Sequence, residues 1–87
     1  MPKRVSKQEI TNCLKALLME VAGISEASIT ASATIDSELR MESVAFVEIQ
    51  VALEDEYDIQ LDPIEVVERN EFGRIVDYVH ALTLEES

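Results

Sequence analysis

The first part of the chain has apolar residues at helical spacing. Between residues 10 and 21 they recur every three or four positions and form one stripe of Ile10, Leu14, Leu17, Leu18 and Val21. This pattern predicts an amphipathic helix. Ser6 and Glu9 have the spacing of a capping box, so we expect the helix to begin near Ser6 and to stop at Gly23.

The next segment, residues 24–39, shows no sustained period and is rich in Ser, Thr and Ala. We expect a long loop here, which is uncommon in a compact domain and often marks a functional segment. Four apolar side chains can anchor this loop to a core: Ile24, Ile29, Ile35 and Leu39.

A second helix is predicted over residues 43–57. Its inward side is expected to consist of Val47, Ala52, Leu53 and Tyr57, with Phe46 and Ile49 beside them. The acidic side chains of this helix must then lie in solvent: Glu48, Glu54, Asp55 and Glu56.

Two further helices follow. Asp62 and Pro63 have the pattern of an N-cap followed by proline at the first helical position, which predicts a short helix over residues 63–68. A last helix is predicted over residues 72–82, where Gly73 weakens the first turn. Its apolar stripe is Phe72, Ile75, Val76, Val79 and Leu82.

The predicted fold class is all-α. We expect a small antiparallel four-helix bundle, with three main helices, one short helix and a long loop between the first two. The 87 residues are enough for a single domain, and its core is expected within residues 6–82. The chain begins with Met and ends in a polar Glu-Glu-Ser, so we expect a free-standing protein.

The net charge of the chain narrows the classes of partner that it can bind. The formal net charge is -11, and residues 36–62 hold nine acidic residues and a single basic one. Such a field repels nucleic acid and anionic membrane surfaces, and it steers basic proteins toward the middle of the chain. No apolar run approaches the roughly 20 residues that span a bilayer. We expect a monomer that binds neither nucleic acid nor membrane.

Cysteine usage points to the compartment. The single Cys13 excludes an internal disulfide and a Cys-based zinc site, and the first residues lack the apolar stretch of a secretory signal. Both features fit a reducing cytoplasm. We expect Cys13 to be a half-buried small residue at the margin of the first apolar stripe rather than a reactive thiol.

Ser43 is the most informative residue, because it stands where an acidic loop meets the second helix. A serine there can cap the helix, which contributes about 1 kcal/mol. It can also serve as an attachment point, since a phosphate on its oxygen would lie at a helix N-terminus. Spacing alone favours the cap and leaves both interpretations open.

Two other kinds of site are rejected, one because of its spacing and one because the fold offers no concave surface for it. An EF-hand loop starting at Asp36 would place Met41 where glycine is needed and Val47 where the bidentate glutamate is needed. A hydrolase would pair Ser43 with His80 and Asp77, but small helices offer little concavity for an oxyanion hole. We therefore predict no metal ligands and no catalytic residues, and we expect His80 to be a helix-terminal cation.

Four stretches of the chain together match the pattern of a known family: Leu39-Arg-Met-Glu-Ser43-Val, Val47-Glu-Ile49, Ala52-Leu-Glu-Asp-Glu-Tyr-Asp-Ile59 and Val76-Asp-Tyr-Val79. In these stretches the chain resembles acyl carrier proteins. The resemblance implies that a phosphopantetheinyl transferase attaches 4′-phosphopantetheine from coenzyme A to Ser43. The thiol of that arm would hold acyl groups as thioesters, and the protein would do no chemistry itself.

The resemblance also implies a docking surface and a place for the cargo. Acyl-transferring and acyl-modifying enzymes with basic patches would meet Glu42, Val44, Glu48, Val51, Glu54 and Asp55. Short or medium acyl chains would enter an interior lined by Phe46, Val47, Ala52 and Val66, with the third helix as a mobile gate.

Four residues near Ser43 depart from the family pattern. Glu42 replaces the usual aspartate, Arg40 and Met41 add bulk and a positive charge, and Ala45 replaces a common acidic residue. These changes indicate a dedicated set of partners in fatty-acid, polyketide or related biosynthesis. Two alternatives stay open: an aminoacyl or D-alanyl carrier, and an unmodified acidic helical adaptor that binds a basic protein.

Overall fold

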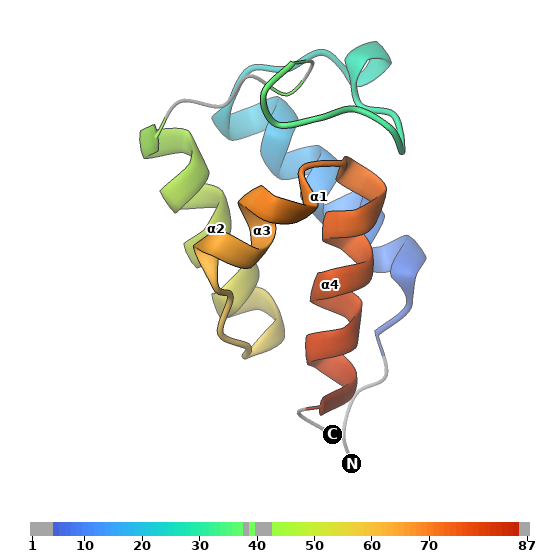
Figure 1. Cartoon of the computed structure of the whole chain (residues 1–87), viewed down its shortest axis with the longest axis vertical. Helices are drawn as coiled ribbons and strands as arrows, with labels where there is room; N and C mark the ends of the chain where they lie inside the picture. The colour runs from blue at the N-terminus through green and yellow to red at the C-terminus, as the bar shows by residue number, and fades with distance from the viewer. Residues whose placement is uncertain (1–4, 38, 40–42, 86–87) are drawn as a thin grey trace.

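The computed structural model describes residues 5–37, 39 and 43–85. Its α-helices are α1 (Lys7–Val21), α2 (Ser43–Tyr57), α3 (Pro63–Arg69) and α4 (Phe72–Glu85), and a 3-10 turn, η1 (Glu26–Ser28), lies in the long loop (Figure 1). Within the described residues the only β-pairing is an isolated bridge between Thr34 and Glu71. The all-α prediction is confirmed, although η1 was not expected and α4 runs three residues further than predicted.

The helices pack around α1. It contacts α2 on one side and α4 on the other, and α3 packs on α4. In Figure 1, α1 runs against the direction of both α2 and α4, while the short α3 lies across the space between them. The long loop from α1 to α2 passes over the end of the bundle at which α4 begins.

The predicted stripes of α1 and α4 form most of the core. Their buried members are Ile10, Leu14, Leu18, Phe72, Ile75, Val76 and Val79. Leu17, Val21 and Leu82 are partly buried against them. The predicted loop anchors are confirmed as well: Ile29 and Leu39 are buried, and Ile24 and Ile35 pack at the margin of the core.

The two ends of α1 form as predicted. The Ser6 hydroxyl oxygen accepts a hydrogen bond of 3.1 Å from the backbone N–H of Glu9. Gly23 has a φ of 69°, a left-handed conformation that costs glycine little. That turn lets the N–H groups of Ala22 and Ile24 both donate to the Leu18 carbonyl oxygen, at 3.2 Å each.

The long loop caps the N-terminus of α4. The N–H of Phe72 donates to the Ala33 carbonyl at 2.8 Å, and that of Gly73 donates to the Ala31 carbonyl at 2.9 Å. A Cβ on residue 73 would lie 3.1 Å from the Ala31 oxygen. Gly73 therefore allows a close approach of two backbones, which is a further role beside the predicted weakening of the first turn.

The predicted inward side of α2 is wrong at Val47, and Ala52 is only partly buried. Ile49 and Leu53 are buried and Phe46 and Tyr57 pack against the core, but Val47 is 57% exposed. A helix turns by about 300° over three residues, so Val47 lies beside Val44 on the outer side. The periodicity was ambiguous because α2 carries apolar residues on nearly every side.

Candidate functional site

Ser43 is the first residue of α2, as the sequence predicts. Its side chain and residues 40–42 lie outside the described residues, and with them the predictions for Arg40, Met41 and Glu42. The start of a 15-residue helix offers free backbone N–H groups and the positive end of the helix dipole. Such a position favours a phosphate ester on the serine oxygen.

The outer side of α2 is apolar and acidic. Val44, Val47 and Val51 are 69%, 57% and 54% exposed, and their spacing of three and four residues places them on one side. Glu48 and Asp55 are exposed along the same side. We call these five residues the outer α2 face. Four of them were predicted as docking residues, whereas Val47 was predicted to face inward although its spacing from Val44 and Val51 could have revealed its exposure.

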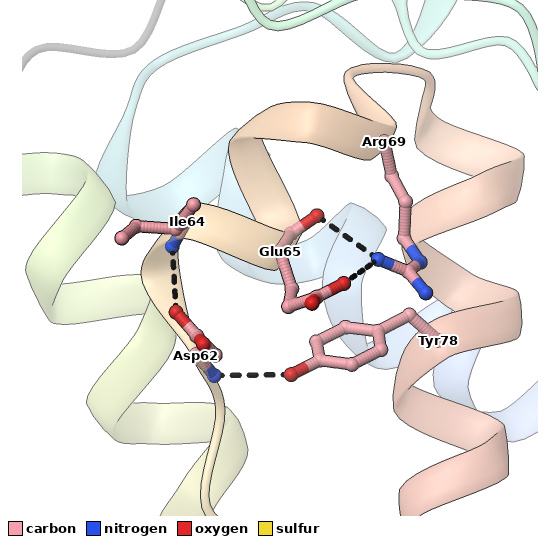
Figure 2. Close-up of polar contacts among 5 residues, drawn as sticks. All are labelled: Asp62, Ile64, Glu65, Arg69 and Tyr78. Atoms are coloured by element: carbon pink, nitrogen blue, oxygen red, sulfur yellow. Dashed lines mark hydrogen bonds and ion pairs between the residues drawn. The ribbon is translucent and has the colours of Figure 1, made fainter.

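Two apolar residues on α3 are exposed, and neither was singled out from the sequence. Ile64 is 67% exposed and Val67 is 54% exposed, whereas Val66 between them is buried. Figure 2 shows the Ile64 side chain pointing away from Tyr78 and α4. Their spacing of three residues on a short amphipathic helix was the available signal, because Val66 alone satisfies the inward side.

Glu54 occupies a different place from the other predicted docking carboxylates. It is half-buried, and its Oε2 accepts a hydrogen bond of 2.8 Å from the backbone N–H of Leu61. One turn earlier on α2, Gln50 donates from its Nε2 to the Leu61 carbonyl oxygen at 3.3 Å. The structure thus brings Glu54 to the loop between α2 and α3, at the margin of the outer α2 face.

The start of α3 is held from the other side by α4. The Asp62 carboxylate caps α3 by accepting from the Ile64 N–H at 2.9 Å, and Pro63 is the first helical residue, as predicted. The Asp62 N–H in turn donates to the Tyr78 hydroxyl oxygen at 3.1 Å (Figure 2). At the other end of α3, Arg69 lies 4.4 Å from the centre of the Tyr78 ring and pairs with Glu65.

A small apolar cavity lies under α2 and α3. Its volume is about 30 Å³, and its lining is Leu14, Leu18, Leu39, Phe46, Ile49, Gln50, Leu53, Leu61, Val66 and Ile75. Phe46 and Val66 line it as predicted, whereas Val47 and Ala52 do not. A water molecule needs about 10–15 Å³ by a comparable measure, so an acyl chain of more than a few carbons would require the helices to separate.

One side chain of the rejected hydrolase constellation, that of Asp77, is engaged elsewhere. The Asp77 carboxylate lies 3.0 Å from the Lys7 ammonium, which joins α4 to the first turn of α1. The backbone carbonyl of His80 accepts a hydrogen bond of 2.6 Å from the Thr83 hydroxyl. Asp77 therefore serves the α1–α4 contact instead of orienting a histidine.

Cys13 and Tyr57 lie together between α1 and α2. Cys13 is half-buried, as predicted. Partial burial raises the pKa of the Tyr57 hydroxyl, and the neighbouring Cys13 side chain raises it further. The phenol therefore stays neutral well beyond the pH at which tyrosine ordinarily ionises.

Two searches of the described residues found nothing. Across residues 5–37, 39 and 43–85 no group of three or more His, Cys, Asp or Glu side chains is arranged to hold a metal ion. In that same part of the chain, every helix is too short or too polar to cross a bilayer.

The model of the family described as phosphopantetheine attachment site matches residues 13–79. The chain belongs to this family. It is 30% identical over 80 residues to an acyl carrier protein of Acidothermus cellulolyticus, covering 92% of this chain and 95% of that protein. It is also 26% identical over 74 residues to an acyl carrier protein of Thermotoga maritima, covering 85% and 91%.

A further relative carries a more specific name. The chain is 30% identical over 77 residues to a meromycolate extension acyl carrier protein of Mycolicibacterium aurum, covering 88% of this chain and 79% of that protein. These matches confirm the resemblance to acyl carrier proteins. The chain is a non-catalytic acyl carrier whose covalent cofactor is 4′-phosphopantetheine, and as a carrier it works with a phosphopantetheinyl transferase and with biosynthetic enzymes.

The start of α2 fits this cofactor. The helix begins at the serine, and the next residue, Val44, is 69% exposed, so the surface beside the serine is open. When bound, the cofactor supplies a terminal thiol on a long flexible arm, and the thiol carries the acyl group.

Proposed function

We propose that Ser43 is the attachment site and that the loaded arm delivers acyl intermediates to enzymes of fatty-acid, polyketide or related biosynthesis. The observation that carries this proposal is the position of Ser43 as the first residue of α2, inside the matched residues 13–79. A transferase would join the serine oxygen to the phosphate of the arm and release the nucleotide part of coenzyme A. The positive end of α2 then stabilises the phosphodiester.

The outer α2 face is the proposed docking surface. Its exposed valines give a partner an apolar contact, and Glu48 and Asp55 attract basic side chains around that contact. Electrostatic attraction of this kind speeds encounter and adds specificity more than it adds affinity. A carrier that visits many enzymes needs such fast, reversible contacts, and the partners are expected to bind it as a monomer.

The exposed pair on α3 extends the proposed contact. Ile64 and Val67 lie in the sequence directly after the α2–α3 loop and are as exposed as the valines of α2. Singly scattered apolar residues are ordinary on protein surfaces, but five on two neighbouring helices indicate a surface that another protein covers in turn.

The relatives bear on the choice of cargo. One of them is named a meromycolate extension acyl carrier protein, which supports a pathway that extends fatty acyl chains over an aminoacyl or D-alanyl pathway. The cavity of about 30 Å³ is too small to enclose such a chain as it stands. We therefore propose that α3 moves as a gate when cargo enters.

The experiment that tests this function is a mapping of the modified residue. The chain is incubated with coenzyme A and a broad-specificity transferase, digested, and sequenced by tandem mass spectrometry. We expect the phosphopantetheine group on the peptide that contains Ser43. Modification at another serine, such as the exposed Ser37, would refute the assignment. A chain that stays unmodified would support the acidic adaptor.

A further inference from the structure

Leu61 is held to α2 through both of its backbone polar groups. Its N–H donates to Glu54 at 2.8 Å and its carbonyl accepts from Gln50 at 3.3 Å. Leu61 is only 7% exposed and lines the cavity together with Gln50. Leu61, whose backbone is hydrogen-bonded to α2, is therefore also part of the cavity wall.

The hydrogen bond that holds the Leu61 N–H is accepted by a carboxylate that has no basic partner among the described residues. Among the described residues no basic side chain pairs with Glu54, so its negative charge faces a neutral N–H donor. A hydrogen bond with one ionised partner is already stronger than a neutral one, and a cationic donor adds the attraction between opposite charges. An incoming lysine or arginine can therefore compete with the Leu61 N–H for the carboxylate.

Glu54 is within reach of such a cation because of its position on the helix. It precedes the exposed Asp55 directly and follows the exposed Val51 by three residues, so it borders the outer α2 face. Glu54 is half-buried, so the residue is partly open to the surface. No hydrogen bond among the described residues joins Glu48 or Asp55 to the loop, so Glu54 alone of the three links the face to the cavity wall.

We propose that Glu54 couples partner docking to opening of the cavity. A basic side chain of a partner at the outer α2 face takes the Glu54 carboxylate from the Leu61 N–H. The loop between α2 and α3 then loosens, and the cavity wall formed by Leu61 can move. The proposal rests on the proposed docking function and adds to it the residue through which docking acts on the cargo site.

The coupling has a thermodynamic condition. A cation shifts the loop only as far as it binds the released carboxylate more tightly than the carboxylate held by Leu61. By reciprocity, a chain with an open loop binds the cation more tightly by the same factor. Both sides of this linkage can be measured on the unmodified chain, so a failure of arm attachment at Ser43 would leave these measurements intact.

The first experiment measures hydrogen exchange of the Leu61 amide by NMR in Glu54→Ala, in Glu54→Gln and in Asp55→Asn as the matched control. A lost hydrogen bond to a charged group predicts at least about tenfold faster exchange at Leu61 in Glu54→Ala. Glu54→Gln keeps an acceptor oxygen and is expected to show a smaller increase. Asp55→Asn is expected to match the wild type. Unchanged exchange in Glu54→Ala, with the fold intact by circular dichroism, overturns the proposal.

The second experiment adds a cation in solution. A hexa-arginine peptide is titrated at low salt, and its binding is followed by the amide shifts of Glu48 and Asp55. In the wild type we expect the bound peptide to speed Leu61 exchange several-fold, whereas in Glu54→Gln the peptide should bind without that effect. Equal acceleration in both proteins, or binding to the wild type without acceleration, overturns the coupling.

Discussion

The backbone N–H of Asp62 donates to the Tyr78 hydroxyl oxygen at 3.1 Å, which joins the residue before α3 to the middle of α4. The neighbouring Leu61 is held by α2, so adjacent residues of one loop are bound to two different helices. The aromatic ring of the same tyrosine lies under Arg69, near the end of α3 (Figure 2). Tyr78 therefore touches both ends of the short helix that we propose as the gate.

Removing the Tyr78 hydroxyl should loosen the start of α3. Tyr78→Phe keeps the ring under Arg69 and loses the hydrogen bond, so we expect the free energy of unfolding to fall by about 1 kcal/mol. Amide exchange at Asp62 should rise while amides of α1 keep their protection. Tyr78→Leu, which also loses the ring, should be less stable than Tyr78→Phe. A Phe variant with wild-type exchange at Asp62 would show that the hydroxyl does not hold α3.

The cap of α1 gives a stability prediction that does not involve the functional surface. Ser6→Ala removes the acceptor for the Glu9 N–H and should lower the free energy of unfolding by about 1 kcal/mol, measured by urea denaturation. Ser6→Asp restores an acceptor and adds a charge that the helix dipole favours, so it should recover that loss. An alanine variant as stable as the wild type would contradict the capping role.

The raised pKa of Tyr57 predicts that the folded protein loses stability at alkaline pH. The folded state holds the phenol proton more tightly than the unfolded state, whose tyrosine ionises near the usual pKa of 10.0. Above that pH the unfolded state binds fewer protons than the folded state, so the free energy of unfolding decreases as pH rises. Tyr57→Phe should lose less stability than the wild type between about pH 9 and about pH 11. Parallel pH profiles for the two proteins would refute the assignment.

Charge reversal on the outer α2 face should slow docking. The double variant Glu48→Lys, Asp55→Lys should lower the kcat/KM of arm attachment by a broad-specificity transferase, on the order of tenfold at low salt. The difference should shrink at high salt, because screening removes the long-range attraction. The matched control is Glu20→Lys with Glu9→Lys on α1, which changes net charge equally at exposed positions of another helix. Equal losses in both double variants would point to net charge alone.

Sequence patterning predicted the elements with one apolar stripe. α1 and α4 each bury a single stripe, so the period sufficed to place them, and a capping pattern marked the start of α1. On α2 apolar residues also occupy the outer side, which is why Val47 was assigned to the interior. Apolar residues occur both in a core and on a surface that binds another protein, and only the fold distinguishes the two.

Contacts between segments that lie far apart in the chain could not be predicted from the sequence. Nothing in the local pattern of residues 24–39 indicates that Ala31 and Ala33 cap α4, because the partner amides lie some forty residues away. The sequence likewise treats Glu48, Glu54 and Asp55 as equivalent surface carboxylates. The structure separates Glu54 from the other two, because the path of the loop after α2 brings the Leu61 N–H back to it.

The central claim is that Ser43 carries the arm, and intact-protein mass tests it most directly. The wild type, Ser43→Ala and Ser37→Ala are each incubated with coenzyme A and a broad-specificity transferase. We predict that the wild type and Ser37→Ala gain the mass of one phosphopantetheine group and that Ser43→Ala gains none. A wild type that gains nothing, or a Ser43→Ala variant that gains the same mass, would contradict the account.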